Sequence, residues 1–256
     1  MNARRVLTIA VLGITALLVN VAALAQISPP PQEKQILDLT NRDRAAQGLT
    51  PLAWDSSLAE AARKHVQIMV QYGQLSHQYP GEPALVVRAG QAGAHFSAVA
   101  ENVAEGPTPA AIEQEWMHST PHRTNILDPQ MNHLGVAIAA RDGQLYAVED
   151  FSSAVASLSP SEVEQRVGGL LRERGIEPSG PTAEARKDCA MESGSAGPSH
   201  PLSIMRWESS NINALPPQLI QQLGNGKLKT AAVGACSSTS RPNQGFTTYR
   251  VAVLLY

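Results

Sequence analysis

The strongest constraint on the fold lies in residues 134–153, which read LGVAIAARDGQLYAVEDFSS. Two apolar runs flank Asp142-Gly143, and Asp-Gly favours a two-residue hairpin turn because both turn positions need positive φ angles. Helical patterns come before this hairpin in the chain. Helices followed by an antiparallel pair of strands predict the α/β (α+β) class, with helices layered on a sheet.

Three helical segments are predicted ahead of the hairpin. Residues 33–47 form the first, and residues 56–72 form the second, whose apolar positions recur at helical spacing and which stops at Gly73. The third begins at Pro109, since proline suits the first turn of a helix, and ends at Pro121. Each segment is long enough to cover one face of a sheet.

The first 25 residues have the features of a secretory signal peptide. Arg4 and Arg5 precede a mostly apolar run, and Ala23-Leu24-Ala25 is typical of a cleavage site. No later segment approaches the roughly 20 apolar residues that a membrane span needs. We therefore expect a secreted, extracellular protein without a stable span after cleavage, with the periplasm as the alternative compartment.

Composition excludes some partners and predicts a cross-link. The net charge of −2 offers no basic field for nucleic acid. Cys189 and Cys236 are expected to pair, because disulfides persist in oxidising compartments. Closing that loop would stabilise the fold by roughly 4 kcal/mol on the chain-entropy model.

The character of the chain changes near residue 156. Ser159 and Glu162 form a capping box for a helix, and the last residues, FTTYRVAVLLY, predict a strand. Between them, 178–201 is rich in Gly, Ser and Pro and is predicted as loop. We detect no internal repeat, and assign 157–256 to a C-terminal accessory region of mixed helix and strand, of unknown type.

Six motifs in residues 32–153 resemble one family. They are LDLTNRDRAAQGLTPLAWDSSLAEAARKHVQIM, LSH, AENVAEG, EWMHSTPHRTNIL, LGVAIA and YAVEDF. In this order they resemble the CAP superfamily of cysteine-rich secretory, antigen five and pathogenesis-related proteins, in its bacterial SCP-like extracellular branch. The resemblance implies an α-β-α sandwich with a central antiparallel sheet, which we place at residues 26–156.

The resemblance also implies a cleft lined by two histidines and two acidic residues. Carried over by position, His77 and His122 are the histidines and Glu101 is the first acid. The second acid falls on Ser119 in this chain, which removes one carboxylate. His77, Glu101 and His122 would suit a divalent metal, zinc first, with a fourth position open to water. The alternative is a metal-free hydrogen-bonded network of the same four residues.

Three functions remain open at this stage. The first is a secreted binding module whose cleft holds a small apolar or lipid-like ligand or a protein or peptide partner. The second is a metal-assisted extracellular hydrolase, and the third is a structural or interaction protein of the cell envelope. A serine hydrolase is disfavoured, because Pro121 breaks the helical face between Ser119 and His122 and no G-x-S-x-G motif is present. No residue is therefore assigned as catalytic, and we expect a binding module rather than an enzyme.

Overall fold

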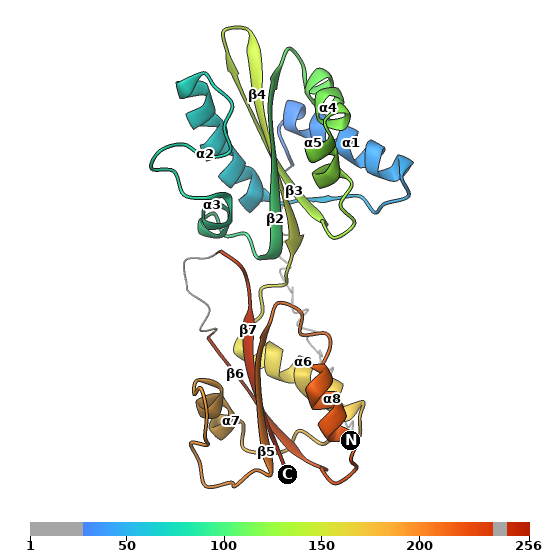
Figure 1. Cartoon of the computed structure of the whole chain (residues 1–256), viewed down its shortest axis with the longest axis vertical. Coiled ribbons are helices and arrows are strands. Elements are labelled where there is room, and N and C mark those ends of the chain that lie inside the picture. Colours follow the sequence, from blue (N-terminus) through green and yellow to red (C-terminus); the bar gives the residue numbers. More distant parts are fainter. Residues whose placement is uncertain (1–27, 238–244) are drawn as a thin grey trace, which may run out of the picture.

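The computed structural model describes residues 28–237 and 245–256. The predicted signal peptide, residues 1–25, lies outside the described residues. The chain forms two lobes joined by residues 155–159, each built around its own sheet (Figure 1). Within the described part of the chain, none of the helices has the length and apolar character needed to cross a membrane.

The first lobe contains five helices and four strands among its described residues: α1 Pro31–Ala46, β1 Ala53–Trp54, α2 Ser56–Tyr72, α3 Leu85–Gln91, β2 Phe96–Gly106, α4 Pro109–His118, α5 Thr120–Ile126, β3 His133–Arg141 and β4 Gln144–Ala154. The sheet order is β1-β3-β4-β2. Helices α2 and α3 cover one face, and α1, α4 and α5 cover the other (Figure 1). This arrangement confirms the predicted α-β-α sandwich, although β1 pairs with β3 in parallel.

Local sequence explains the elements that position the sheet. Asp55 accepts hydrogen bonds from the backbone N–H groups of Ser57 and Leu58 and so caps α2, which ends at Gly73 in the left-handed conformation. The turn between β3 and β4 places Asp142 and Gly143 at positive φ, as the predicted hairpin requires. The predicted helices and hairpin are confirmed here.

Two sequence expectations need correction in this lobe. The 11-residue strand β2 was not predicted, because its sequence FSAVAENVAEG lacks a simple alternation of apolar and polar residues. Pro121 does not simply end a helix: α4 ends at His118, and Pro121 lies in the first turn of α5. His122 is therefore a helical residue.

The second lobe has three helices and three strands among its described residues: α6 Pro160–Arg172, α7 Thr182–Cys189, β5 Ser203–Ser209, α8 Pro217–Leu223, β6 Ala231–Cys236 and β7 Tyr249–Leu255. The capping box of Ser159 and Glu162 begins α6, as predicted. The Cys189–Cys236 disulfide is confirmed and ties α7 to β6. Helix α7 corrects the prediction of an unbroken loop over 178–201.

The second lobe repeats the topology of the first. Its strand order β6-β7-β5 corresponds to β3-β4-β2, and both sheets are antiparallel at these pairs. A parallel bridge between Glu177 and Thr230 stands where β1 pairs with β3. Helices α6 and α8 pack on one face of this sheet, as α1, α4 and α5 do in the first lobe. Helix α7 packs on the other face, as α2 does. The two lobes therefore share a topology. The second lobe has one helix, α8, where the first has α4 and α5, and its described residues form no helix in the place of α3.

Both lobes contain a glycine where a helix meets the sheet closely. A Cβ atom on Gly135 of β3 would lie 2.1 Å from the backbone nitrogen of Ala59 in α2. One on Gly234 of β6 would lie 2.2 Å from the backbone of Ala185 in α7. Only glycine allows this approach, since helix backbone cannot move aside without disturbing the core.

We expect Gly234→Ala to destabilise the second lobe by about 1–3 kcal/mol, because the new methyl group overpacks the α7–β6 contact. Gly169→Ala in α6 is the matched control: its Cβ would meet nothing within 4 Å, so it should stabilise by about 0.5–1 kcal/mol. Urea unfolding followed by circular dichroism and tryptophan fluorescence measures both. Equal stability of the two variants would contradict the close approach.

Candidate functional site

The pairing of β2 with β4 sends polar side chains to both faces of the first sheet. Glu101 is opposite Asp150 in the register, and the next pair along is Asn102 opposite Glu149. Because successive residues of a strand point to opposite faces, each pair faces a different helical layer. Glu101 and Asp150 face α2 and α3, while Asn102 and Glu149 face α1, α4 and α5.

On the α2–α3 face, His77, Arg88, Glu101 and Asp150 form a group that we call the edge cluster, because β2 is an edge strand of the sheet. The Nδ1 atom of His77 lies 2.8 Å from Oε1 of Glu101. The other carboxylate oxygen of Glu101 forms an ion pair with Arg88. The Arg88 and Glu101 side chains are 5% and 3% exposed, so this pair is buried beneath a histidine that is 62% exposed.

These contacts fix the state of the His77 ring. A carboxylate paired with a guanidinium only accepts hydrogen bonds, so Nδ1 of His77 must donate to it. Partial burial and, after it, the positive charge of Arg88 lower the pKa of His77. At neutral pH the ring is therefore uncharged, with its proton on Nδ1 and a free acceptor at Nε2.

Asp150 lies behind this pair and is fully buried. Its nearer carboxylate oxygen is 3.9 Å from Arg88, and neither oxygen has a hydrogen-bond partner within the described structure. Burial raises the pKa of Asp150 to about 7, with the Arg88 charge opposing that rise. Asp150 is thus a second acidic group at the site, contributed by β4 rather than by the region of Ser119.

His122 approaches the site from the opposite helical layer. The carbonyl of His122 accepts a hydrogen bond from Asn102, which holds α5 against β2. The Nδ1 atom of His122 is buried without a partner in the described residues. Burial, and after it the proximity of His77, lower the pKa of His122. Ser119 sits at the α4–α5 junction, and no hydrogen bond in the described part joins it to either histidine.

A second buried group, which we call the inner cluster, comprises Thr40, Asn102, Glu113 and Glu149. The Thr40 hydroxyl lies 2.8 Å from Glu149 and 3.2 Å from Glu113. A hydroxyl has one proton to donate, so the second contact requires a protonated carboxyl as donor. Burial, and next the charge of Glu149, raise the pKa of Glu113 to about 9. The inner cluster therefore holds one proton in the folded state.

The donor set does not suit a three-ligand metal site. Glu101 already uses one oxygen on His77 and the other on Arg88, and a guanidinium beside a carboxylate opposes a cation there. No group of three His, Cys, Asp or Glu side chains among the described residues is arranged to hold a metal ion. Two nitrogens remain as possible ligands, Nε2 of His77 and the unpartnered Nδ1 of His122. The three-ligand set stays a prediction of the resemblance.

Comparison with known proteins identifies the first lobe. Residues 37–151 match the family model "CAP: Cysteine-rich secretory protein family". The first lobe is a CAP domain over residues 37–151, somewhat less than half of the chain. Its recognition from the six sequence motifs is thereby confirmed.

Similar proteins are found in other bacteria. YkwD of Bacillus subtilis (strain 168) is 37% identical over 125 residues, which are 48% of this chain and 48% of YkwD. The membrane protein YlbC of the same strain is 38% identical over 108 residues, 41% of this chain and 31% of YlbC. A 1.5 Å crystal structure of an extracellular protein containing a SCP domain from Bacillus anthracis str. Ames is 31% identical. It covers 47% of this chain and 40% of that chain, with a TM-score of 0.44.

This chain therefore spans about half of YkwD and about a third of YlbC. The similarity to both relatives is confined to segments of CAP-domain length. What either whole protein does is not carried over to this chain.

Several residues of the CAP domain site were not foreseen from the sequence. Arg88 lies in α3, outside the three predicted helical segments, and nothing in its neighbours marks it as buried. Glu149-Asp150 had a visible signal, since two acidic residues interrupt the apolar run YAVEDF. A charged pair inside a strand that is otherwise buried must find partners on both faces of the sheet.

The inner cluster makes the stability of the CAP domain depend on pH. Glu113 binds a proton more tightly in the folded than in the unfolded chain, so the folded state holds more protons between about pH 5 and 9. Its contribution to stability is complete at low pH and is lost as pH rises through that window. For one proton the slope approaches about 1.4 kcal/mol per pH unit.

We expect Glu113→Gln to flatten this dependence, because a neutral amide replaces the protonated carboxyl and can still donate to Thr40. Urea unfolding at pH 5, 7 and 9 measures the free energy of unfolding of wild type and variant. The exposed Glu60→Gln serves as the control that should keep the wild-type slope. Parallel curves for wild type and Glu113→Gln would show that the inner cluster holds no proton.

Proposed function

We propose that this protein is an extracellular binding module whose CAP domain takes a small ligand with an apolar body and a hydroxyl or amide donor. The ligand's donor would bind Nε2 of His77. The observation that carries the proposal is an exposed, uncharged imidazole held in one tautomer by the buried Glu101–Arg88 pair. An imidazole fixed in this way loses little conformational entropy when it accepts a hydrogen bond from a ligand.

Apolar side chains next to His77 support an amphipathic ligand. Leu75, two residues earlier, is 37% exposed, and Tyr72 at the end of α2 is 56% exposed. The Tyr72 ring stacks on Tyr79, with centroids 4.6 Å apart, and the Tyr79 hydroxyl donates to the carbonyl of Gln74. These contacts hold the 72–79 segment, so that its apolar groups and His77 are presented together.

A comparison of the buried residues in the two sheets supports the same proposal. Strands β5, β6 and β7 of the second lobe repeat the topology of the CAP domain, yet no carboxylate is buried on them. Apolar residues pack on both faces of that sheet, among them Val251 and Leu254. The strands of this topology form a sheet without buried carboxylates, although α7 buries Glu184 and Asp188. Glu101, Glu149 and Asp150 are therefore better explained by a role at the site than by a need of the sheet.

Metal-assisted chemistry is the second candidate, favoured by one observation, the unpartnered Nδ1 of His122. In that case His77 and His122 would hold the ion, and Glu101 would orient His77 through its hydrogen bond. A bound Zn²⁺ would supply an acidified water.

Extracellular location rests on the predicted signal peptide, and the similar Bacillus anthracis protein is itself described as extracellular.

Titration calorimetry with decan-1-ol, a hydroxyl on an apolar chain, tests the binding proposal on the mature two-lobed protein. We expect His77→Ala to weaken binding about fivefold, since a hydrogen bond contributes about 1 kcal/mol. Leu75→Ser should weaken it through lost apolar contact. His118→Ala, an exposed histidine of α4, is the control that should bind as wild type does.

Unchanged affinity in His77→Ala would contradict the proposal. A parallel titration with Zn²⁺ separates the second candidate. Binding of the ion that is lost in both His77→Ala and His122→Ala, without decanol binding, would favour the metal site instead.

A further inference from the structure

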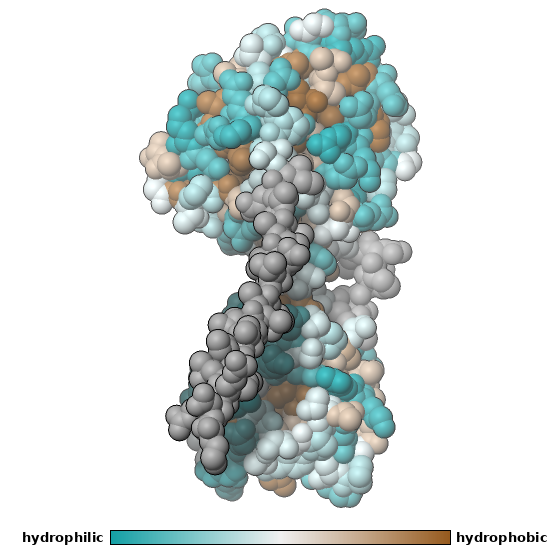
Figure 2. Space-filling view, turned by 180° about the vertical axis from the view of Figure 1, so that it is seen from behind, coloured by the Kyte–Doolittle hydropathy of each residue, from teal (hydrophilic) through white to brown (hydrophobic). Residues whose placement is uncertain are grey.

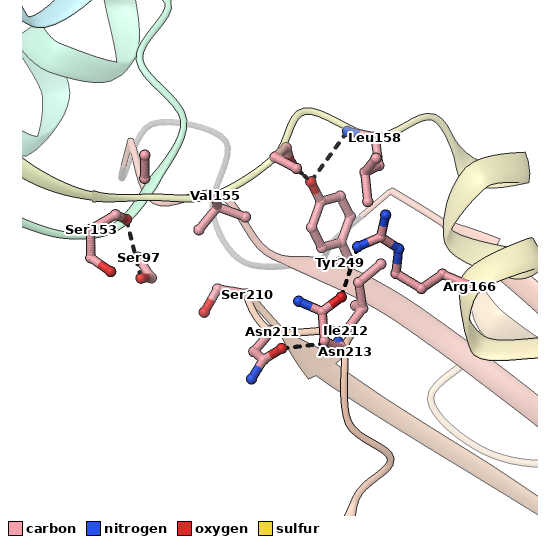
Figure 3. A pocket seen from close by; sticks show the side chains of 12 residues that line it. Ser97, Ser153, Val155, Leu158, Arg166, Ser210, Asn211, Ile212, Asn213 and Tyr249 are labelled. Carbon is pink, nitrogen blue, oxygen red and sulfur yellow. Dashed lines mark hydrogen bonds between the residues drawn. The ribbon is translucent and has the colours of Figure 1, made fainter. Parts of the chain in front are cut away.

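A cavity lies where the two lobes meet, away from the edge cluster. Its volume is about 310 Å³, at the small end of the range for ligand pockets. Figure 3 shows the side chains that converge on it from the start of β2, the linker, α6, the β5–α8 loop and the start of β7. Both lobes contribute, and Figure 2 shows the narrow waist between them.

The lobes are fixed to each other beside this cavity. The backbone N–H of Thr247 donates to the carbonyl of Phe96 at 2.8 Å, and the Phe96 and Phe246 rings meet edge to face with centroids 5.7 Å apart. A Cβ atom on Gly245 would collide with the carbonyl of Val86 in α3. The chain just before β7 therefore packs directly on the CAP domain.

Charge at the cavity is of one sign. Arg166 of α6 is the one ionised side chain among the twelve residues that line it, and no carboxylate lines it. One guanidinium nitrogen donates to Oδ1 of Asn213 at 2.7 Å, which orients the group. A guanidinium carries five N–H donors in a planar fork that matches a carboxylate. In the described residues no acidic side chain lies within ion-pair distance of Arg166. Glu162, one turn earlier in α6, acts on Arg166 electrostatically, but its carboxylate lies outside the lining and accepts hydrogen bonds from Ser159. The cavity therefore favours an anionic ligand.

Tyr249 gives the cavity a rigid flat wall. Its hydroxyl donates to the carbonyl of Ala156 and accepts from the backbone N–H of Leu158, 3.2 Å away. These two bonds tie the linker between the lobes to β7. The hydroxyl is thus occupied and the ring is held in place, so what it offers a ligand is an aromatic surface (Figure 3).

The remaining polar lining consists of hydroxyl and amide groups. Ser153 and Ser210 contribute hydroxyls, and Asn211 accepts from the backbone N–H of Asn213 through its Oδ1. That bond fixes the amide of Asn211 and leaves its NH₂ group as a donor. Small hydroxyl and amide groups around one arginine and one aromatic ring suit a ligand rich in hydroxyls that also carries a carboxylate.

We propose that this inter-lobe cavity binds a sugar acid of monosaccharide size. Arg166 pairs with the carboxylate, the Tyr249 ring packs against the sugar ring, and Ser153, Ser210 and Asn211 bind hydroxyls. The site needs both lobes, because Ser153 comes from the CAP domain and the others come from the second lobe. It is independent of the function proposed for the edge cluster, since the two sites share no residue.

Isothermal titration of the full mature protein with D-glucuronate, D-glucose and N-acetyl-alanyl-alanine tests this proposal. We expect glucuronate to bind with a millimolar or tighter Kd. Glucose, which lacks the carboxylate, and the peptide, which lacks the hydroxyls, should each bind at least tenfold more weakly. Arg166→Gln should weaken glucuronate at least tenfold, and Arg166→Lys should restore part of the affinity.

Arg174→Gln is the matched control. Arg174 follows α6, and its guanidinium donates to the carbonyl of Leu170 outside the cavity, so its loss should leave glucuronate binding unchanged. The proposal is wrong if glucuronate does not bind, if glucose or the peptide binds as tightly, or if Arg166→Gln and Arg174→Gln behave alike. Circular dichroism establishes that each variant is folded before it is titrated.

Discussion

The buried ion pair between Arg88 and Glu101 is the interaction on which the CAP domain site depends. It joins α3 to the edge strand β2 and lies beneath His77, whose backbone carbonyl also accepts a weak hydrogen bond from Arg88 at 3.4 Å. Removing one partner of a buried pair costs about 3–5 kcal/mol, because the other charge is left uncompensated. Such a pair is a costly way to join a helix to a strand, and what it provides is a histidine ring held in one orientation and one tautomer.

The polar strand β2 explains how residues from both helical layers come to act on one edge. Its two faces carry Glu101 and Asn102, which bind partners on opposite sides of the sheet. Asn102 contacts Glu149 of the inner cluster and the carbonyl of His122, and Asn125 of α5 donates to its Oδ1 atom at 2.9 Å. These hydrogen bonds fix the position of α5 relative to Glu101 and His77 on the other face of the sheet.

Much of this architecture could be predicted, and the exceptions have physical causes. The capped helix α2 and the Asp142-Gly143 hairpin depend on local signals, which a single sequence displays. The Cys189–Cys236 cross-link was predictable because the chain has only two cysteines. Strand β2 was missed because its buried positions hold Glu101 and Asn102, whose partners are distant in the chain. The likeness of the second lobe to the CAP domain could not be predicted from the sequence, because it lies in strand order and not in residue types.

The residues of the candidate site also fall into those that the sequence marks and those that it does not. His77, Glu101 and His122 were proposed because short motifs mark them, whereas Arg88 and Asp150 depend on the β2–β4 register and on the packing of α3. Without Arg88, Glu101 looks like a metal ligand. With Arg88 in place it is the acceptor that orients His77, which changes the chemistry expected of the whole group.

The tautomer and charge of His77 test this account most directly. Long-range ¹⁵N–¹H correlation spectra of the mature protein at pH 7, assigned with His77→Ala, distinguish the two neutral tautomers and the imidazolium by their nitrogen shifts. We expect an uncharged ring protonated at Nδ1, with Nε2 unprotonated. A ring protonated at Nε2, or an imidazolium at this pH, would contradict it.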